Sequence, residues 1–190
     1  MISRNLGFRV CYNTFMSFFQ ENKIKKITHP QAKFFIQQFL RDREINYQFF
    51  KRVPEEKMDF RMVDTPQRKS DAPRESLAHQ IDTTRDYING IKTGVLKFGI
   101  VYSDLTPGTK LTKEQLLKKW DEVVEELITL LSDPKISERK VRVPWSKEPV
   151  LAVDMLWGLD SHEILHQGWN LALMDHLNIE RFAELKAMWG

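Results

Sequence analysis

The sequence predicts an all-α protein, an antiparallel four-helix bundle with long connectors and a short C-terminal helix. Four segments repeat apolar residues at the spacing of three and four that one face of a helix requires. Connectors that contain Pro and Gly separate these segments, and no internal repeat or low-complexity tract interrupts them. At 190 residues the chain fits one domain that can bury a sizeable core.

The first helix is expected over residues 31–53, because Phe35, Phe39 and Phe50 fall near one face. Pro54 ends this pattern, and residues 54–70 are expected to form a loop. The second helix follows, with Ser70 or Asp71 as its cap and Pro73 in its first turn, where a missing N–H costs little. Its periodicity weakens around residues 89–90.

The third helix opens at Thr112, where Gln115 three residues later makes a capping box, and extends to about residue 131. Residues 141–145 alternate but contain Pro144, so we expect an extended loop or at most a short hairpin arm. The last long helix is expected from near Pro149 to about residue 177, with Asn178 at its end. It is apolar over most of its circumference, which indicates burial against several neighbours. Residues 179–189 are expected to form a short terminal helix.

Composition and charge argue against several classes of protein. The net charge is only +3, and acidic and basic residues are interspersed, so nucleic-acid binding is disfavoured. No apolar run approaches the roughly 20 residues of a transmembrane helix. The single Cys11 cannot form an internal disulfide, which suits a reducing compartment, and we expect a cytoplasmic protein.

Two of the five histidines lie one helical turn apart in the last long helix. His162 and His166 share one face, with Cβ atoms about 5–6 Å apart, so both imidazoles can reach one metal ion. A third ligand is needed, and His79 in the second helix is the best candidate. Such a pair also arises by chance, so the spacing alone is weak evidence. His29 and His176 are expected at the surface.

Several short segments resemble the DinB-like (DNA-damage-inducible) family, the relatives of YfiT. They are FRMVDTP at 60–66, Ser70, and LAHQI at 77–81, in which a Pro-containing loop precedes a helix that carries one ligand histidine. The closing pattern is His162, His166 and Gly168. The resemblance covers residues 30–190 and leaves 1–29 as an N-terminal extension. It implies a four-helix bundle with a three-histidine metal site formed by His79, His162 and His166.

Three protein nitrogens are the ligand set of an ion that keeps positions open for a substrate. A closed structural site would recruit a cysteine or a fourth histidine, and none has an obvious place here. Neutral imidazoles suit Zn, Ni, Cu or Fe, and we expect a divalent ion, zinc or nickel.

Acidic residues near the expected ligands are candidates for a catalytic role. Asp82 and Glu75 could orient His79 through its second nitrogen or act on bound water, although a plain surface role is the alternative. Glu163 projects about 100° away from His162 on the same helix, so we expect it to face solvent or a neighbouring helix.

The resemblance also implies a class of activity. Members of the family include S-transferases that use a low-molecular-weight thiol such as bacillithiol or mycothiol, and metal-dependent hydrolases. We therefore expect a transferase of a thiol to an electrophile, with a metal-dependent hydrolase or a non-catalytic metal-binding stress protein as alternatives. A small-molecule substrate and a homodimer are expected, with no nucleic-acid or membrane partner.

Two features limit which functional roles of the family can be assigned to residues of this chain. Gln167 and Trp169 stand where the family commonly has Arg and Gln around the glycine, so the roles of those residues do not carry over. An anionic thiol would also need a basic rim, for which Arg61, Arg74 and Arg142 are the candidates.

Overall fold

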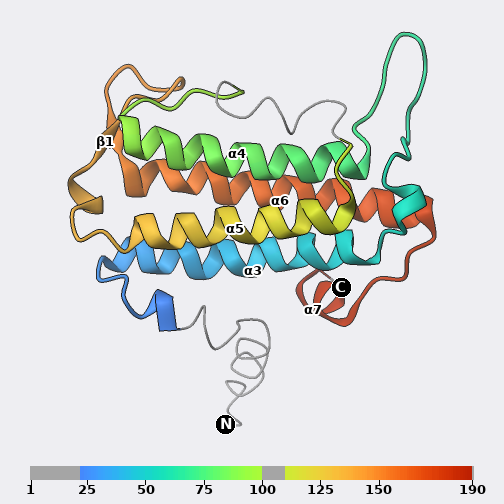
Figure 1. The fold of residues 1–190 in the computed structure, drawn as a ribbon, viewed down its shortest axis with the longest axis horizontal. Coiled ribbons are helices and arrows are strands. Elements are labelled where there is room, and N and C mark those ends of the chain that lie inside the picture. Colours follow the sequence, from blue (N-terminus) through green and yellow to red (C-terminus); the bar gives the residue numbers. More distant parts are fainter. Residues whose placement is uncertain (1–21, 100–109, 190) are drawn as a thin grey trace, which may run out of the picture.

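The computed structural model describes residues 22–99 and 110–189. Four long helices lie side by side along a common axis (Figure 1): α3 (Pro30–Arg52), α4 (Pro73–Thr93), α5 (Lys113–Leu131) and α6 (Ala152–Leu177). Helices α3 and α6 run in one direction and α4 and α5 in the other. The predicted four-helix bundle is confirmed.

The helices form a closed ring around one core. Helix α3 packs mainly on α6 and α4 on α5, while α4 contacts α6 and α3 contacts α5. Neighbours α4 and α5 are parallel, so the chain must return along the bundle between them. Figure 1 shows it turning back after α4, and the backbone N–H of Gly99 donates to Asp86 Oδ2 on that helix at 2.8 Å.

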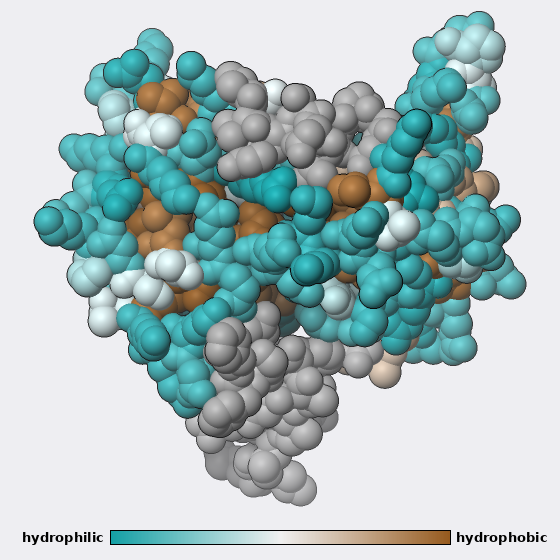
Figure 2. Space-filling view, in the orientation of Figure 1, coloured by the Kyte–Doolittle hydropathy of each residue, from teal (hydrophilic) through white to brown (hydrophobic). Residues whose placement is uncertain are grey.

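The core is built from the apolar faces that the periodicity predicts. Phe35, Phe39 and Phe50 of α3 are fully buried, and Trp120 of α5 packs edge-on against Phe50 with ring centroids 5.9 Å apart. The face of the molecule seen in Figure 2 is largely hydrophilic where it is coloured, with apolar residues visible in patches.

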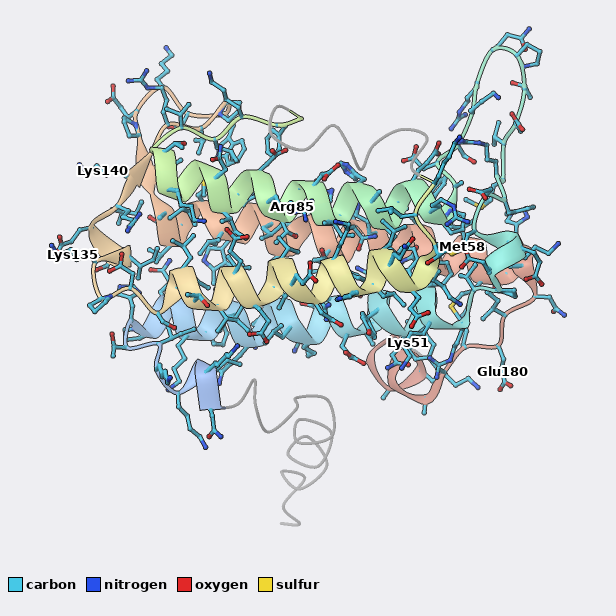
Figure 3. All side chains as sticks on the ribbon, viewed as in Figure 1. Lys51, Met58, Arg85, Lys135, Lys140 and Glu180 are labelled. Carbon is cyan, nitrogen blue, oxygen red and sulfur yellow. The ribbon has the colours of Figure 1, made fainter. Side chains whose placement is uncertain are left out.

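Charged side chains are distributed over the whole bundle. Figure 3 labels Lys135 and Lys140 at one end of the bundle and Lys51 and Glu180 at the other. None of the helices in the described part of the chain is long and apolar enough to cross a membrane. Most of the expected N-terminal extension, residues 1–21, lies outside the described residues.

Helix α4 begins at the predicted Pro73, but its N-cap is Ala72 and not Ser70 or Asp71. The reason is that Glu75 completes this cap, because its Oε2 accepts from the backbone N–H of Ala72 at 3.0 Å. The helix continues through the weak region around residue 90 and ends at Gly94, which has a left-handed φ of 77°.

Helix α6 begins at Ala152, three residues after the expected start near Pro149. Val150–Leu151 instead forms strand β2, which pairs antiparallel with β1 (Lys140–Val141) in a two-stranded sheet. The predicted end at Asn178 is confirmed by its left-handed φ of 55°. The terminal helix α7 (Ala183–Trp189) is shorter than expected, and two 3-10 turns, η1 (Glu55–Lys57) and η2 (Ile136–Glu138), follow α3 and α5.

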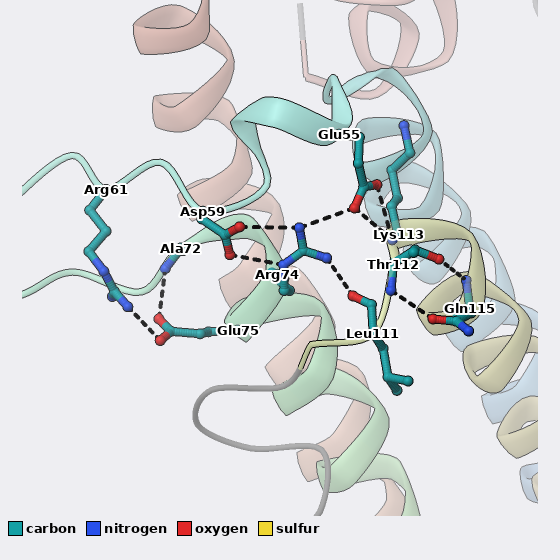
Figure 4. A network of polar contacts seen from close by, with 10 residues as sticks. All are labelled: Glu55, Asp59, Arg61, Ala72, Arg74, Glu75, Leu111, Thr112, Lys113 and Gln115. Carbon is teal, nitrogen blue, oxygen red and sulfur yellow. Dashed lines mark hydrogen bonds and ion pairs between the residues drawn. The ribbon is translucent and has the colours of Figure 1, made fainter.

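A polar network at the start of α4 joins three connectors (Figure 4). The Arg74 guanidinium donates to Asp59 at 2.9 Å, to Glu55 at 3.1 Å and to the carbonyl of Leu111 before α5. Arg61 pairs with Glu75 at 2.5 Å. Two of the three arginines predicted for a basic rim are therefore paired within this network.

Candidate metal centre

Helices α4 and α6 bring His79, His162 and His166 together, and we call these three residues the histidine cluster. The Nε2 of His162 lies 2.9 Å from that of His79 and 3.1 Å from that of His166. One donor atom from each ring lies within 4.8 Å of the other two. The convergence arises because His162 and His166 share one face of α6 and α4 packs antiparallel against that face.

The arrangement fits a divalent metal ion. Nitrogen ligands at about 2.0–2.1 Å from a tetrahedral ion lie about 3.3 Å from one another. The Nε2 separations in the cluster are close to this value, so small ring rotations would admit an ion. The three nitrogens could therefore hold a metal.

The cluster opens toward solvent on one side. His79 is exposed, His162 is half-buried and His166 is 8% exposed. This gradient places the closed side of the cluster deep in the seam between α4 and α6. The solvent-exposed side of the cluster is therefore the side of His79.

Partial desolvation lowers the pKa of each of the three imidazoles and so favours the neutral rings. The pKa is lowered to about 4 for His162 and to about 3 for His166, and desolvation is the main cause in both. The pKa of His79 is also lowered by burial, against the opposing charges of Asp71 and Asp86. Because only the neutral ring binds a metal ion, the cluster is ready to bind one at neutral pH.

Ser76 orients the innermost histidine. Its buried hydroxyl lies 3.1 Å from Nδ1 of His166, which leaves Nε2 of that ring directed at the other two histidines. Metal-binding histidines commonly use their second nitrogen in this way. Ser76 was not among the residues predicted from the sequence, although its position three residues before His79 puts both on one face of α4.

The two carboxylates predicted to be catalytic have different surroundings. Glu75 accepts from Arg61 through one oxygen and from the Ala72 N–H through the other, so both oxygens serve the N-terminus of α4. Asp82 is buried, with Oδ1 at 3.9 Å from Nη1 of Arg85, which Figure 3 labels on α4. A catalytic role for Glu75 or Asp82 remains a prediction.

A third carboxylate lies on the histidine side of α4. Asp86 follows His79 by seven residues, and the two groups interact electrostatically. Burial raises the pKa of Asp86, against the hydrogen bond from the Gly99 N–H. The i, i+7 spacing from His79 was the signal that could have identified it.

An adjacent face of α6 contacts α3 through polar side chains. Glu163 is fully buried there, and its Oε2 accepts from Nδ2 of Asn46 at 2.8 Å. Burial raises the pKa of Glu163 to about 7. Gln167 donates to the backbone carbonyl of Asp42 at 2.8 Å. Of the two expectations for Glu163, the one that places it against a neighbouring helix is correct.

The two remaining histidines lie outside the cluster. His29 caps α3 with Nδ1, which accepts from the Ala32 N–H at 3.4 Å, and His176 is exposed near the end of α6.

Comparison with known proteins identifies the family. The DinB superfamily model matches residues 38–169, well over half of the chain, and this span contains all three histidines of the cluster. No curated protein matches the chain. The extent of the family match and the helical bundle around the cluster lead to one conclusion: the chain belongs to the DinB superfamily.

Proposed function

We propose that His79, His162 and His166 hold a divalent metal ion, zinc or nickel, in an enzyme that transfers a low-molecular-weight thiol to an electrophile. The observation that supports this most is the convergence of three neutral imidazoles at a site that is open beside His79. Bacillithiol and mycothiol are the thiols that the family resemblance suggests.

The donor set favours a reactive ion over a structural one. Among the described residues, no cysteine, carboxylate or further histidine joins the cluster as a fourth ligand. A divalent ion held by three nitrogens with open positions lowers the pKa of a coordinated thiol and so supplies the thiolate nucleophile.

The side chains around the cluster would have different roles in binding and catalysis. His162 and His166 hold their positions because both lie on α6 in the packed seam, and Ser76 orients the second of them. The exposed His79 borders the entrance for substrates. Asp82 and Asp86 on α4 are the carboxylates that we propose to test as acceptors of the thiol proton, because both of Glu75's oxygens already accept hydrogen bonds.

The test combines elemental analysis with an assay of thiol transfer. Metal-loaded protein should consume bacillithiol or mycothiol together with a chlorobimane electrophile faster than the uncatalysed reaction. His162→Ala should abolish this turnover and retain the helical circular dichroism spectrum, whereas His176→Ala should retain both. Hydrolysis of esters or amides without a thiol would favour the hydrolase. Metal binding with neither thiol transfer nor hydrolysis would favour the non-catalytic stress protein.

We also propose that the protein is a cytoplasmic homodimer. The adjacent Ile164 and Leu165 of α6 are 41% and 72% exposed, and a subunit interface would remove these two apolar side chains from water. Light scattering of the purified chain measures the oligomeric state directly, and a monomeric mass at micromolar concentration would reject the dimer.

A further inference from the structure

We propose that Phe98 and Trp145 form an aromatic platform that binds a planar, apolar group of the electrophile while its reactive end lies at the histidine cluster. This inference rests on the proposed transferase function and specifies the substrate class as aromatic electrophiles.

The platform is a pair of stacked, solvent-exposed rings. The Phe98 and Trp145 centroids lie 6.4 Å apart with an interplanar angle of 26°. Phe98 is 47% exposed and Trp145 is 55% exposed, so each ring leaves much of its surface in water. Near-parallel rings present flat apolar faces and edges that a third aromatic ring can stack against.

Backbone pairing holds the two rings in register. Phe98 follows α4, and Trp145 lies in the connection between β1 and β2. The N–H of Leu96 donates to the carbonyl of Arg142 at 2.9 Å, and the N–H of Arg142 donates to the carbonyl of Gly94 at 2.8 Å. These two bonds join the segments just before each ring, so the platform is preorganised.

Tyr87 packs against the platform and lies in the same α4–α6 seam as the histidine cluster. Its ring centroid lies 5.9 Å from that of Phe98, and its side chain is 4% exposed. Its hydroxyl lies directly over Gly158, where an added Cβ would be 2.5 Å from Oη. Gly158 is four residues before His162, a distance of about 6 Å along α6.

The distance between the aromatic platform and the histidine cluster can be spanned by one small molecule. Tyr87 lies eight residues after His79, or about 12 Å along α4, and Phe98 adjoins Tyr87, so a ligand that spans the platform and the cluster must be about 10–15 Å long. The partly exposed Phe34 provides a contrast: it is 54% exposed but meets Trp157 at a tilted 51° and shows no near-parallel pair. Phe34 is therefore the matched control residue.

The experiment compares two hydroxamates that share one metal-binding headgroup. Isothermal titration calorimetry of the zinc-loaded full chain measures the affinities of hexanohydroxamate and of phenylhexanohydroxamate, which differ only in the terminal ring. We expect the phenyl compound to bind at least about tenfold more tightly to the parent protein. Phe98→Ala and Trp145→Ala should each remove most of this advantage and leave hexanohydroxamate binding unchanged, while Phe34→Ala should preserve both affinities.

The outcomes separate this inference from the function on which it rests. Suppose that both hydroxamates bind, but the phenyl compound binds no more tightly, or its advantage persists in Phe98→Ala and Trp145→Ala. The proposal of an aromatic platform is then wrong, while the proposal of an open metal site is retained. If neither hydroxamate binds, the proposal of an open metal site is wrong. The platform is then tested by nuclear magnetic resonance with phenylhexanoate, which should shift the Trp145 indole N–H signal; an unchanged signal would overturn the inference.

Discussion

Ser76 determines which nitrogen of His166 is available to a metal ion, because its hydroxyl lies 3.1 Å from Nδ1 and leaves Nε2 free. Removing such a contact from a ligand typically costs about 10–100-fold in metal affinity. We therefore expect Ser76→Ala to weaken zinc binding by this factor, as measured by competition with a chromophoric chelator.

The matched control is Ser161→Ala on α6. Ser161 directly precedes His162, but its exposed hydroxyl donates to the carbonyl of Trp157 at 2.9 Å. This variant should keep the affinity of the parent. Equal losses in both variants would show that the effect of Ser76 is general destabilisation and not orientation of His166.

The lowered pKa values of the cluster predict how metal binding depends on pH. Protons compete with the metal only when the pH falls toward the pKa of the ligands, here about 4 for His162 and about 3 for His166. Zinc affinity should therefore change by less than about tenfold between pH 7.5 and 5.5. Calorimetric titrations at the two pH values measure the change.

Histidines with an ordinary pKa would behave differently over the same interval. At pH 5.5, three rings with a pKa near 6.5 would each be about nine-tenths protonated, and the affinity would fall about a thousandfold. A loss of that size would mean that the seam between α4 and α6 does not desolvate the cluster.

At the scale of the helices, Gly158 permits the close approach of α6 to α4 at Tyr87. Its added Cβ would lie 2.5 Å from the Tyr87 hydroxyl, which forces a shift in a well-packed seam. We expect Gly158→Ala to lower the free energy of unfolding by about 1–3 kcal/mol. In the Tyr87→Phe background the clash is absent, and the substitution should stabilise by up to about 1 kcal/mol through helix propensity.

Gly168 on the same helix supplies the control. A Cβ there meets no atom within 4 Å, so Gly168→Ala should stabilise by about 1 kcal/mol in either background. Urea denaturation of the four combinations with Gly158 and Tyr87 measures the coupling between these two positions. Additive effects would mean that the two helices do not depend on this contact.

For the whole molecule, a metal bound to the cluster would link α4 and α6 and stabilise the fold by mass action. Zinc at a hundred times its Kd should add about 2.7 kcal/mol, which is about 5–10 °C in Tm for a chain of this size. Thermal unfolding followed by circular dichroism, with and without a chelator, measures the shift.

His79→Ala tests whether both helices contribute. Only His79 comes from α4, so this variant should lose most of the thermal shift, while His29→Ala should retain it. A full shift in His79→Ala would restrict the site to the two histidines of α6 and reject the three-ligand arrangement.

The sequence alone determined the elements that depend on local pattern. Apolar spacing predicts the four helices. Thr112 marks the start of α5 and Asn178 the end of α6, because capping involves residues within one turn. The pairing of His162 with His166 is likewise a property of one helix. His79 is the best candidate in the sequence for the third ligand, and the family resemblance implies the same residue.

The tertiary structure decided what depends on contacts between distant segments. Strand β2 displaces the start of α6 because it pairs with β1, and Ser76 meets His166 across two helices. The direction in which Glu163 faces and the depth at which each histidine is buried follow from packing. Periodicity along one helix places side chains on a face, but only the neighbouring helix decides which of them lose their water, and that desolvation sets the pKa values and the open side of the cluster.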